Sequence, residues 1–183
     1  LIKLNNGEAN NSWPAIEYIA QTSKDEIWYA NSRSLFKLDK QGKQIAVSPP
    51  KIWQSEFEQI KDLEADSFDN IWVASSDKLF VINSVDLSFD SIPLKNLNSG
   101  PATALELHLG AFNDMWVSVD NILYKWNTET KELELISSPD AQLDTTSEND
   151  YIYSIFIDSK RRIWISNKSG LFFGVENSDF HEQ

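Results

Sequence analysis

Side chains that could act in catalysis are few in this chain of 183 residues. It has two histidines, His108 and His181, and no cysteine, so a thiol nucleophile, a thiolate metal site and a disulfide framework are excluded. Neither histidine belongs to a nucleophile elbow or to a paired-histidine metal motif. We expect a structural role for His108, near the end of a strand, and an irregular tail around His181. The sequence therefore predicts no catalytic residue, no metal site and no cofactor.

Acidic side chains gather in the longest segment between two apolar repeats. They are Asp140, Asp144, Glu148 and Asp150. Their spacing does not match the ligand positions of a calcium loop. We expect this segment to be a solvated loop and not a metal site.

Amide, charged and indole side chains recur in the loops between short apolar runs. Such groups could bind a sugar or another small polar ligand, because hydroxyl groups need hydrogen-bonding partners and sugar faces stack on aromatic rings. The candidate ligand-binding residues are Trp13, Asn31, Arg33, Trp53, Asp77, Lys78, Asp120, Asn121, Asn167 and Lys168. The alternatives are ordinary surface roles for the polar residues and, for the two tryptophans, the plugging of junctions between repeats.

A fixed repeat must position these loops. Trp28, Trp72, Trp116 and Trp164 are separated by 44, 44 and 48 residues. Seven residues after each tryptophan comes a leucine followed by an aromatic residue, and nine residues before it stands an aliphatic residue. The leucines are Leu35, Leu79, Leu123 and Leu171, and the aliphatic residues are Ile19, Leu63, Leu107 and Ile155. A period of about 40–50 residues with several short β-rich runs is typical of a β-propeller.

Each repeat predicts one blade of four antiparallel strands separated by turn-forming residues. We therefore predict an all-β protein, a single β-propeller region over residues 1–183 with about four blades at 15–47, 57–94, 103–136 and 151–175. The four repeated tryptophans are expected to be buried scaffold between blades, since an apolar residue repeated at one strand position faces the neighbouring sheet.

The two ends of the chain lack complete blades. Residues 1–4 precede the first repeat at the distance of a fourth, outer strand, so we expect them to form an extra outer strand. After its third strand the last repeat has only residues 176–183, so its outer strand is expected to be short or missing. These features predict a fragment of a larger propeller. Its edges would be completed by ring closure through the N-terminal strand or by a homodimer.

Charge and hydropathy exclude several classes of partner. The formal net charge is −12, without a long block of one sign, which argues against nucleic acid and anionic membrane surfaces. No apolar run approaches the ~18–20 residues of a membrane span, and the first residues do not resemble a signal peptide. We expect a soluble piece of a larger protein.

The repeated phrase resembles the repeats of the two-component regulator propeller family. That phrase is an aliphatic strand, Asp-x-x-x, Ile-Trp-Val-x, a polar loop and Gly-Leu-aromatic. The fourth copy matches best, from Ile155-Phe156-Ile157-Asp158 through Ile163-Trp164-Ile165-Ser166 to Gly170-Leu171-Phe172. Copies one to three lack the glycine, and copies one and three have Thr22 and Gly110 where Asp66 and Asp158 stand. The resemblance covers about residues 15–175.

This resemblance implies a periplasmic sensing module that precedes a membrane helix and a cytoplasmic kinase, response regulator or diguanylate cyclase. We therefore expect a non-enzymatic sensor whose partners are a small polar ligand such as a sugar, or a protein domain, and the rest of the receptor chain. Two alternatives stay open: a propeller enzyme of the lyase or quinone-dependent dehydrogenase kind, and a pure protein-interaction scaffold.

Overall fold

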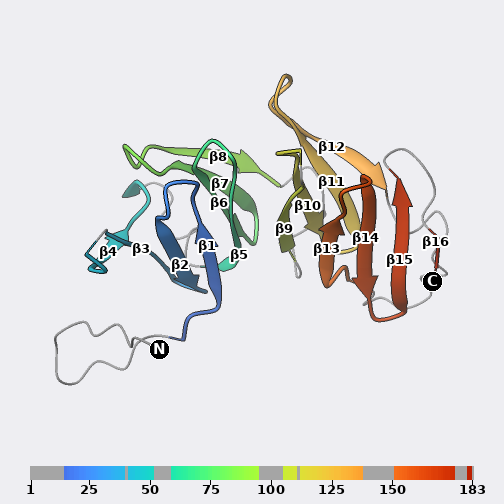
Figure 1. Ribbon diagram of the computed structural model, residues 1–183, viewed down its shortest axis with the longest axis horizontal. Helices are drawn as coiled ribbons and strands as arrows, with labels where there is room; N and C mark the ends of the chain where they lie inside the picture. The colour runs from blue at the N-terminus through green and yellow to red at the C-terminus, as the bar shows by residue number, and fades with distance from the viewer. Residues whose placement is uncertain are drawn as a thin grey trace.

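The described part of the chain is built from β-strands arranged in four antiparallel sheets. The structure is a computed structural model that describes residues 15–39, 41–51, 59–94, 105–110, 112–137, 151–175 and 181–182. Figure 1 shows the sheets following one another in an arc, with the N-terminal and C-terminal sheets at opposite ends. The all-β class and the repeated four-stranded blade are confirmed.

Each blade takes its four strands from consecutive chain, paired in sequence order. Blade 1 contains β1 (Tyr18–Gln21), β2 (Ile27–Asn31), β3 (Ser34–Leu38) and β4 (Gln44–Val47). Blade 2 contains β5 (Ile60–Ala65), β6 (Asn70–Ser75), β7 (Lys78–Asn83) and β8 (Phe89–Pro93). Blade 3 contains β9 (Leu105–Leu109), β10 (Met115–Val119), β11 (Ile122–Asn127) and β12 (Glu132–Ser137). Blade 4 contains β13 (Ser154–Ile157), β14 (Arg162–Asn167), β15 (Gly170–Val175) and β16 (His181–Glu182).

The turn before each repeated tryptophan strand has the same backbone conformation in all four blades. One residue of each turn has a positive φ: Asp25 at 61°, Asp69 at 63°, Asn113 at 63° and Arg161 at 61°. Aspartate and asparagine visit this left-handed region readily because their short side chains bond to nearby backbone. Arg161 adopts the same conformation, so the hairpin predicted for the fourth repeat is present despite its basic turn.

Strand side chains alternate between the two sides of a sheet, so each blade has two faces that can contribute to the hydrophobic core. We call the side that carries the repeated tryptophan the forward face, and the other side the back face. Three hydrophobic clusters join forward and back faces of successive blades: Trp28 with Leu63, Trp72 with Leu107, and Trp116 with Ile155. Blades 1 to 3 thus each bury the forward face on the next blade.

Burial confirms the scaffold prediction for three tryptophans and corrects it for the fourth. Trp28, Trp72 and Trp116 are 0%, 4% and 2% exposed. Trp164 is only half-buried, because among the described residues no further blade packs on the forward face of blade 4.

The chain ends give one confirmation and one correction. The predicted short outer strand of the fourth blade is β16, which pairs with Phe172 and Phe173 of β15. His181 lies in this strand and not in an irregular tail. The extra outer strand predicted for residues 1–4 lies outside the described residues and stays a prediction.

Candidate functional site

The predicted ligand-binding residues that the structure describes lie at one end of the blades. Asn31, Arg33, Asp77, Lys78, Asp120, Asn121, Asn167 and Lys168 stand in or beside the four turns between the second and third strands. They are spread over all four blades. Trp13, Trp53 and the acidic cluster at 140–150 lie outside the described residues.

Several of these residues also stabilise the turns in which they lie. The Oδ1 atom of Asn31 accepts two turn amides at 2.8 Å, and Asn167 accepts the two equivalent amides at 2.9 and 3.1 Å. The carbonyl of Asp120 accepts the amide of Ile152 at 2.8 Å, where the chain enters blade 4. These contacts close turns and fix the start of the next blade, whatever else the side chains bind.

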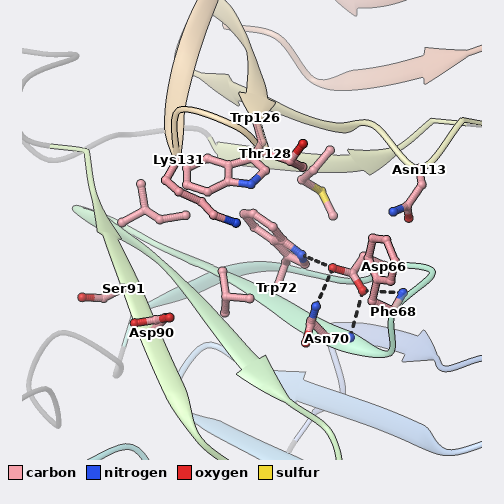
Figure 2. Close-up of a pocket in the computed structure, with 13 residues that line it drawn as sticks. Asp66, Phe68, Asn70, Trp72, Asp90, Ser91, Asn113, Trp126, Thr128 and Lys131 are labelled. Atoms are coloured by element: carbon pink, nitrogen blue, oxygen red, sulfur yellow. Dashed lines mark hydrogen bonds between the residues drawn. The ribbon is translucent and has the colours of Figure 1, made fainter.

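A cleft of about 500 Å³ lies between blades 2 and 3, near the opposite ends of the strands. Its walls come from the β5–β6 turn, the outer strand β8 and the β11–β12 turn (Figure 2). The lining residues are Asp66, Phe68, Asn70, Trp72, Val81, Asp90, Ser91, Ile92, Asn113, Met115, Trp126, Thr128 and Lys131. None of the residues selected from the sequence as ligand-binding is in this set.

Two indoles form the aromatic wall of the cleft. Trp72, on the forward face of blade 2, meets Trp126, on the back face of blade 3, edge to face with ring centroids 5.5 Å apart. Trp72 is buried, whereas Trp126 is half-buried. The residue of blade 2 that corresponds to Trp126 is Ile82, which packs in the cluster with Trp28. The second indole is therefore particular to this junction.

The cleft opens here because a lysine found in two other blades is missing. Lys37 and Lys125 stand opposite Trp28 and Trp116 in the β-ladders and place their Nζ atoms 5.3 Å from the indole centroids. In blade 2 the residue opposite Trp72 is Val81.

Each of these lysines is held by an acidic residue two positions before its tryptophan. Lys37 pairs with Glu26 at 2.7 Å, and Lys125 pairs with Asp114 at 3.3 Å. Lys37 also donates to the carbonyl of Ser84 in blade 2 at 2.9 Å, so it spans the junction. Val81 is too short to do the same, and the space remains open.

At the polar end of the cleft, Asp66 fixes the turn and the indole together. Its Oδ2 atom accepts the Nε1 proton of Trp72 and the Nδ2 proton of Asn70, both at 3.0 Å. Its Oδ1 atom accepts the amides of Phe68 and Asn70, both at 2.9 Å. Because these four bonds occupy the carboxylate, Asp66 orients the site and leaves ligand contacts to its neighbours.

The polar groups that can meet a ligand come from the rims. Thr128 and Lys131 lie in the exposed β11–β12 turn, and Asp90 and Ser91 lie on β8. The cleft thus offers an ammonium, a carboxylate, hydroxyls and indole surface in one concave space. This combination suits a small polar ligand with an apolar face. Among the described lining residues, no serine or threonine is paired with a base.

A second group of titratable side chains lies on the innermost strands of blades 2 and 3. The carboxylate of Asp62 on β5 accepts the amide of Leu107 on β9 at 2.6 Å, which ties blade 2 to blade 3. Burial raises the pKa of Asp62 to about 6, against the opposing effect of its backbone hydrogen bonds. Burial, together with the nearby Asp62 charge, raises the pKa values of Glu64 and Glu106 to about 7. The described residues contain no group of three ligands that could hold a metal ion.

His108 makes the corresponding tie between blades 3 and 4. Its Nε2 atom accepts the amide of Ile157 at 3.2 Å, and its ring packs edge to face on Phe156 at 5.8 Å. Burial lowers the pKa of His108, which favours the neutral imidazole that this bond requires. The structure thus gives His108 the structural partner that the sequence analysis expected.

Sequence reasoning missed the cleft residues Trp126, Thr128 and Lys131. They lie outside the three repeated positions that defined the blades. Two departures could have indicated them: Val81 stands where Lys37 and Lys125 recur, and Trp126 stands where the second blade has an aliphatic residue.

Comparison with known proteins gives a fold and no family. No protein-family model matches the chain, and neither does any curated protein. Within the described residues, no helix has the length and apolarity needed to cross a membrane.

Solved structures resemble the chain over almost its whole length. The extracellular domain assigned to the hybrid two-component system BT4673 from B. thetaiotaomicron matches with a TM-score of 0.73 at 14% identity, over 96% of this chain and 23% of that one. Virginiamycin B lyase from Staphylococcus aureus matches with a TM-score of 0.70 at 14% identity, over 91% of this chain and 54% of that one. YCF48 bound to a peptide matches with a TM-score of 0.62 at 12% identity, over 96% of this chain and 56% of that one.

The chain therefore spans from about a quarter to just over half the length of the structures that it matches. At these identities the similarity shows architecture alone. The four blades, their forward-to-back packing and these matches together show that the chain has the β-propeller fold, as an arc that corresponds to part of larger propellers.

Proposed function

We propose that this chain is a non-enzymatic sensing propeller from the extracytoplasmic, periplasmic input region of a bacterial two-component or diguanylate cyclase-type receptor. In this proposal it binds a small polar ligand such as a sugar in the cleft between blades 2 and 3. The observation that carries the proposal is the cleft itself, where the lysine that seals two other tryptophans is replaced by Val81 and a second indole, Trp126, is added.

The structural matches support the sensing role by analogy of fold. A domain from the extracellular part of a two-component system superposes on nearly the whole chain. The enzyme alternative draws on the match to virginiamycin B lyase, of which a histidine-to-alanine variant is catalytically inactive. In this chain the described imidazole, that of His108, accepts a backbone amide between two blades, which favours a binding module over a lyase.

Intrinsic tryptophan fluorescence tests binding directly. Titration with a panel of neutral and acidic mono- and disaccharides should give a saturable change in emission for at least one sugar, because Trp72 and Trp126 line the site. Isothermal titration calorimetry should reproduce the affinity. The absence of saturable binding across the panel would overturn the sugar assignment.

A graft of blade 1 into blade 2 tests where the ligand binds. The triple variant Asp66→Thr, Asn70→Glu and Val81→Lys copies Thr22, Glu26 and Lys37 at the equivalent positions. The new ammonium should lie over Trp72 and fill the cleft, and it can donate to the carbonyl of Thr128 as Lys37 does to Ser84. Binding should be lost while circular dichroism shows that the variant is still folded, with a lower melting temperature because Trp72 loses its Asp66 acceptor.

The matched control is Lys125→Val, which opens the equivalent space in blade 3 and leaves the cleft untouched. It should bind the sugar like the parent. If the folded triple variant still binds with unchanged affinity, the cleft is not the site.

The receptor assignment has a separate test in the adjoining coding sequence. A membrane helix followed by a histidine kinase or diguanylate cyclase domain would support it. A stop codon directly after Gln183 would contradict it and would leave the ligand-binding result unaffected.

A further inference from the structure

The three junctions between blades share one pair of interlocking residues. The leucine seven residues after the tryptophan of one blade lies in the same cluster as the aliphatic residue nine residues before the tryptophan of the next. The pairs are Leu35 with Leu63, Leu79 with Leu107, and Leu123 with Ile155, and all six side chains are at most 6% exposed. This pair marks where a forward face meets a back face.

The forward face of blade 4 has the leucine of this pair, but no aliphatic residue of a following blade packs on it in the described structure. Leu171, which corresponds to Leu123, is 46% exposed. On the same face Phe156 and Val175 are 57% and 47% exposed. Trp164 stacks on Phe173 of its own blade with ring centroids 5.2 Å apart. The face has the composition of a blade interface.

The back face of blade 1 has the aliphatic residue of this pair, but no leucine of a preceding blade packs on it in the described structure. Ile19, which corresponds to Leu63, is 67% exposed, and Ile16 just before β1 is 54% exposed. The two faces are complementary parts of one kind of interface, but they lie at opposite ends of the arc in Figure 1. In this arrangement one chain does not bring them together.

We propose that the forward face of blade 4 binds the back face of blade 1 in a second copy of this chain, so that two copies close head to tail into one ring. Leu171 of each copy then packs on Ile19 of the other, as Leu123 packs with Ile155 within the chain. Both interfaces of the ring are the same, and each repeats a contact that the chain already makes three times.

The extent of the arc supports a ring of two copies. The chain aligns with 54% of virginiamycin B lyase and with 56% of YCF48, so its four blades correspond to slightly more than half of those proteins. A head-to-tail contact between unlike faces either closes or grows into a filament. Two arcs of about half a ring close it, and closure buries all four exposed faces.

Sedimentation equilibrium and light scattering of the full chain test the proposal. The expected mass is twice the 20.9 kDa of one chain. Leu171→Glu and Ile19→Lys should each give a folded monomer, because both side chains are exposed in the single chain and a charge there opposes burial in the ring.

Mixing the two variants distinguishes head-to-tail closure from other dimers. A mixed dimer has one unaltered interface and one in which the new glutamate faces the new lysine, so an equal mixture should recover the dimer mass. In a dimer formed through two copies of blade 4, Ile19→Lys would stay dimeric and mixing would rescue nothing.

Val85→Glu is the matched control, since Val85 is 74% exposed in the β7–β8 turn and belongs to neither face. It should keep the dimer mass. A parent chain that is monomeric at all concentrations measured would mean that a second copy does not cover these faces and would overturn the proposal. So would a dimer that survives Ile19→Lys.

Discussion

The indole of Trp72 donates its Nε1 proton to the carboxylate of Asp66 at 3.0 Å. Trp164 makes the same bond to Asp158 at 3.2 Å in blade 4. Within the described structure, the Nε1 atoms of Trp28 and Trp116 are buried without a hydrogen-bond acceptor. Two blades therefore hold their tryptophan through an aspartate, and the other two cover it with a lysine.

Asp66→Ala should destabilise the chain by about 2–3 kcal/mol, because it leaves the indole proton of Trp72 and the turn amides of Phe68 and Asn70 without their acceptor. Urea unfolding followed by far-ultraviolet circular dichroism measures the change. Asp86→Ala, which removes an exposed turn carboxylate from β7–β8, is the control and should cost less than about 1 kcal/mol. Equal losses for the two variants would contradict the role given to Asp66.

Thr22→Asp should stabilise the chain by about 1 kcal/mol. The backbone of Thr22 makes the same turn bonds as that of Asp66, and an aspartate there would supply an acceptor for the buried Nε1 of Trp28. Lys37 lies over this indole and offsets the added charge beside Glu26. Thermal melts of Thr22→Asp and of the near-isosteric Thr22→Val should move in opposite directions. A lower melting temperature for the aspartate variant would show that charge repulsion outweighs the new bond.

Trp72→Ala and Trp116→Ala should each cost about 3–5 kcal/mol, as large-to-small changes between packed blades. Trp164→Ala should cost clearly less in the single chain, because its indole is half-buried. Guanidinium unfolding of the three variants provides the comparison. Near-parental stability of either of the first two would contradict their scaffold role.

Stability should fall as the pH rises from about 5.5 to 8. Burial raises the pKa of Asp62 to about 6 and those of Glu64 and Glu106 to about 7, so the folded chain keeps protons that the unfolded chain, with carboxyl pKa values near 4, has released. Burial lowers the pKa of His108, so this residue favours greater stability at higher pH. Its single contribution opposes those of three carboxyl groups.

Urea unfolding across this pH range measures the effect, which for Asp62 alone is about 1 kcal/mol, because most of the loss linked to its raised pKa occurs below pH 5.5. The triple variant Asp62→Asn, Glu64→Gln and Glu106→Gln should flatten the pH profile, whereas Glu129→Gln, in an exposed turn, should leave it unchanged. A parental profile that rises toward pH 8 would contradict the assignment.

The blades were predictable because their evidence is local and repeated. The tryptophan, the leucine after it and the aliphatic residue before it recur at fixed spacing, and period-two alternation then assigns them to opposite faces. The half-burial of Trp164 was not predictable from its own repeat, since burial of a forward face depends on the blade that follows.

The cleft could not be located from spacing alone. The sequence shows Val81 at the position of the recurring lysines, but the register of β6 and β7 is needed to place it opposite Trp72, where its short side chain leaves the cleft open. The substitutions at Thr22 and Gly110 were visible in the sequence, but their meaning needs the direction of the indole Nε1. A Cβ atom added at Gly110 would lie 3.1 Å from the Nε1 of Trp116, so that blade has little room for an aspartate.

The alternation of aspartate and lysine means that the molecule has a longer period than the blade. Trp28 and Trp116, 88 residues apart, are each covered by a lysine. Trp72 and Trp164, 92 residues apart, each donate a hydrogen bond to an aspartate. Gain or loss of two adjacent blades would preserve this order, whereas gain or loss of one would set two blades of the same kind side by side. The natural unit for duplicating or recombining this protein is therefore a pair of blades.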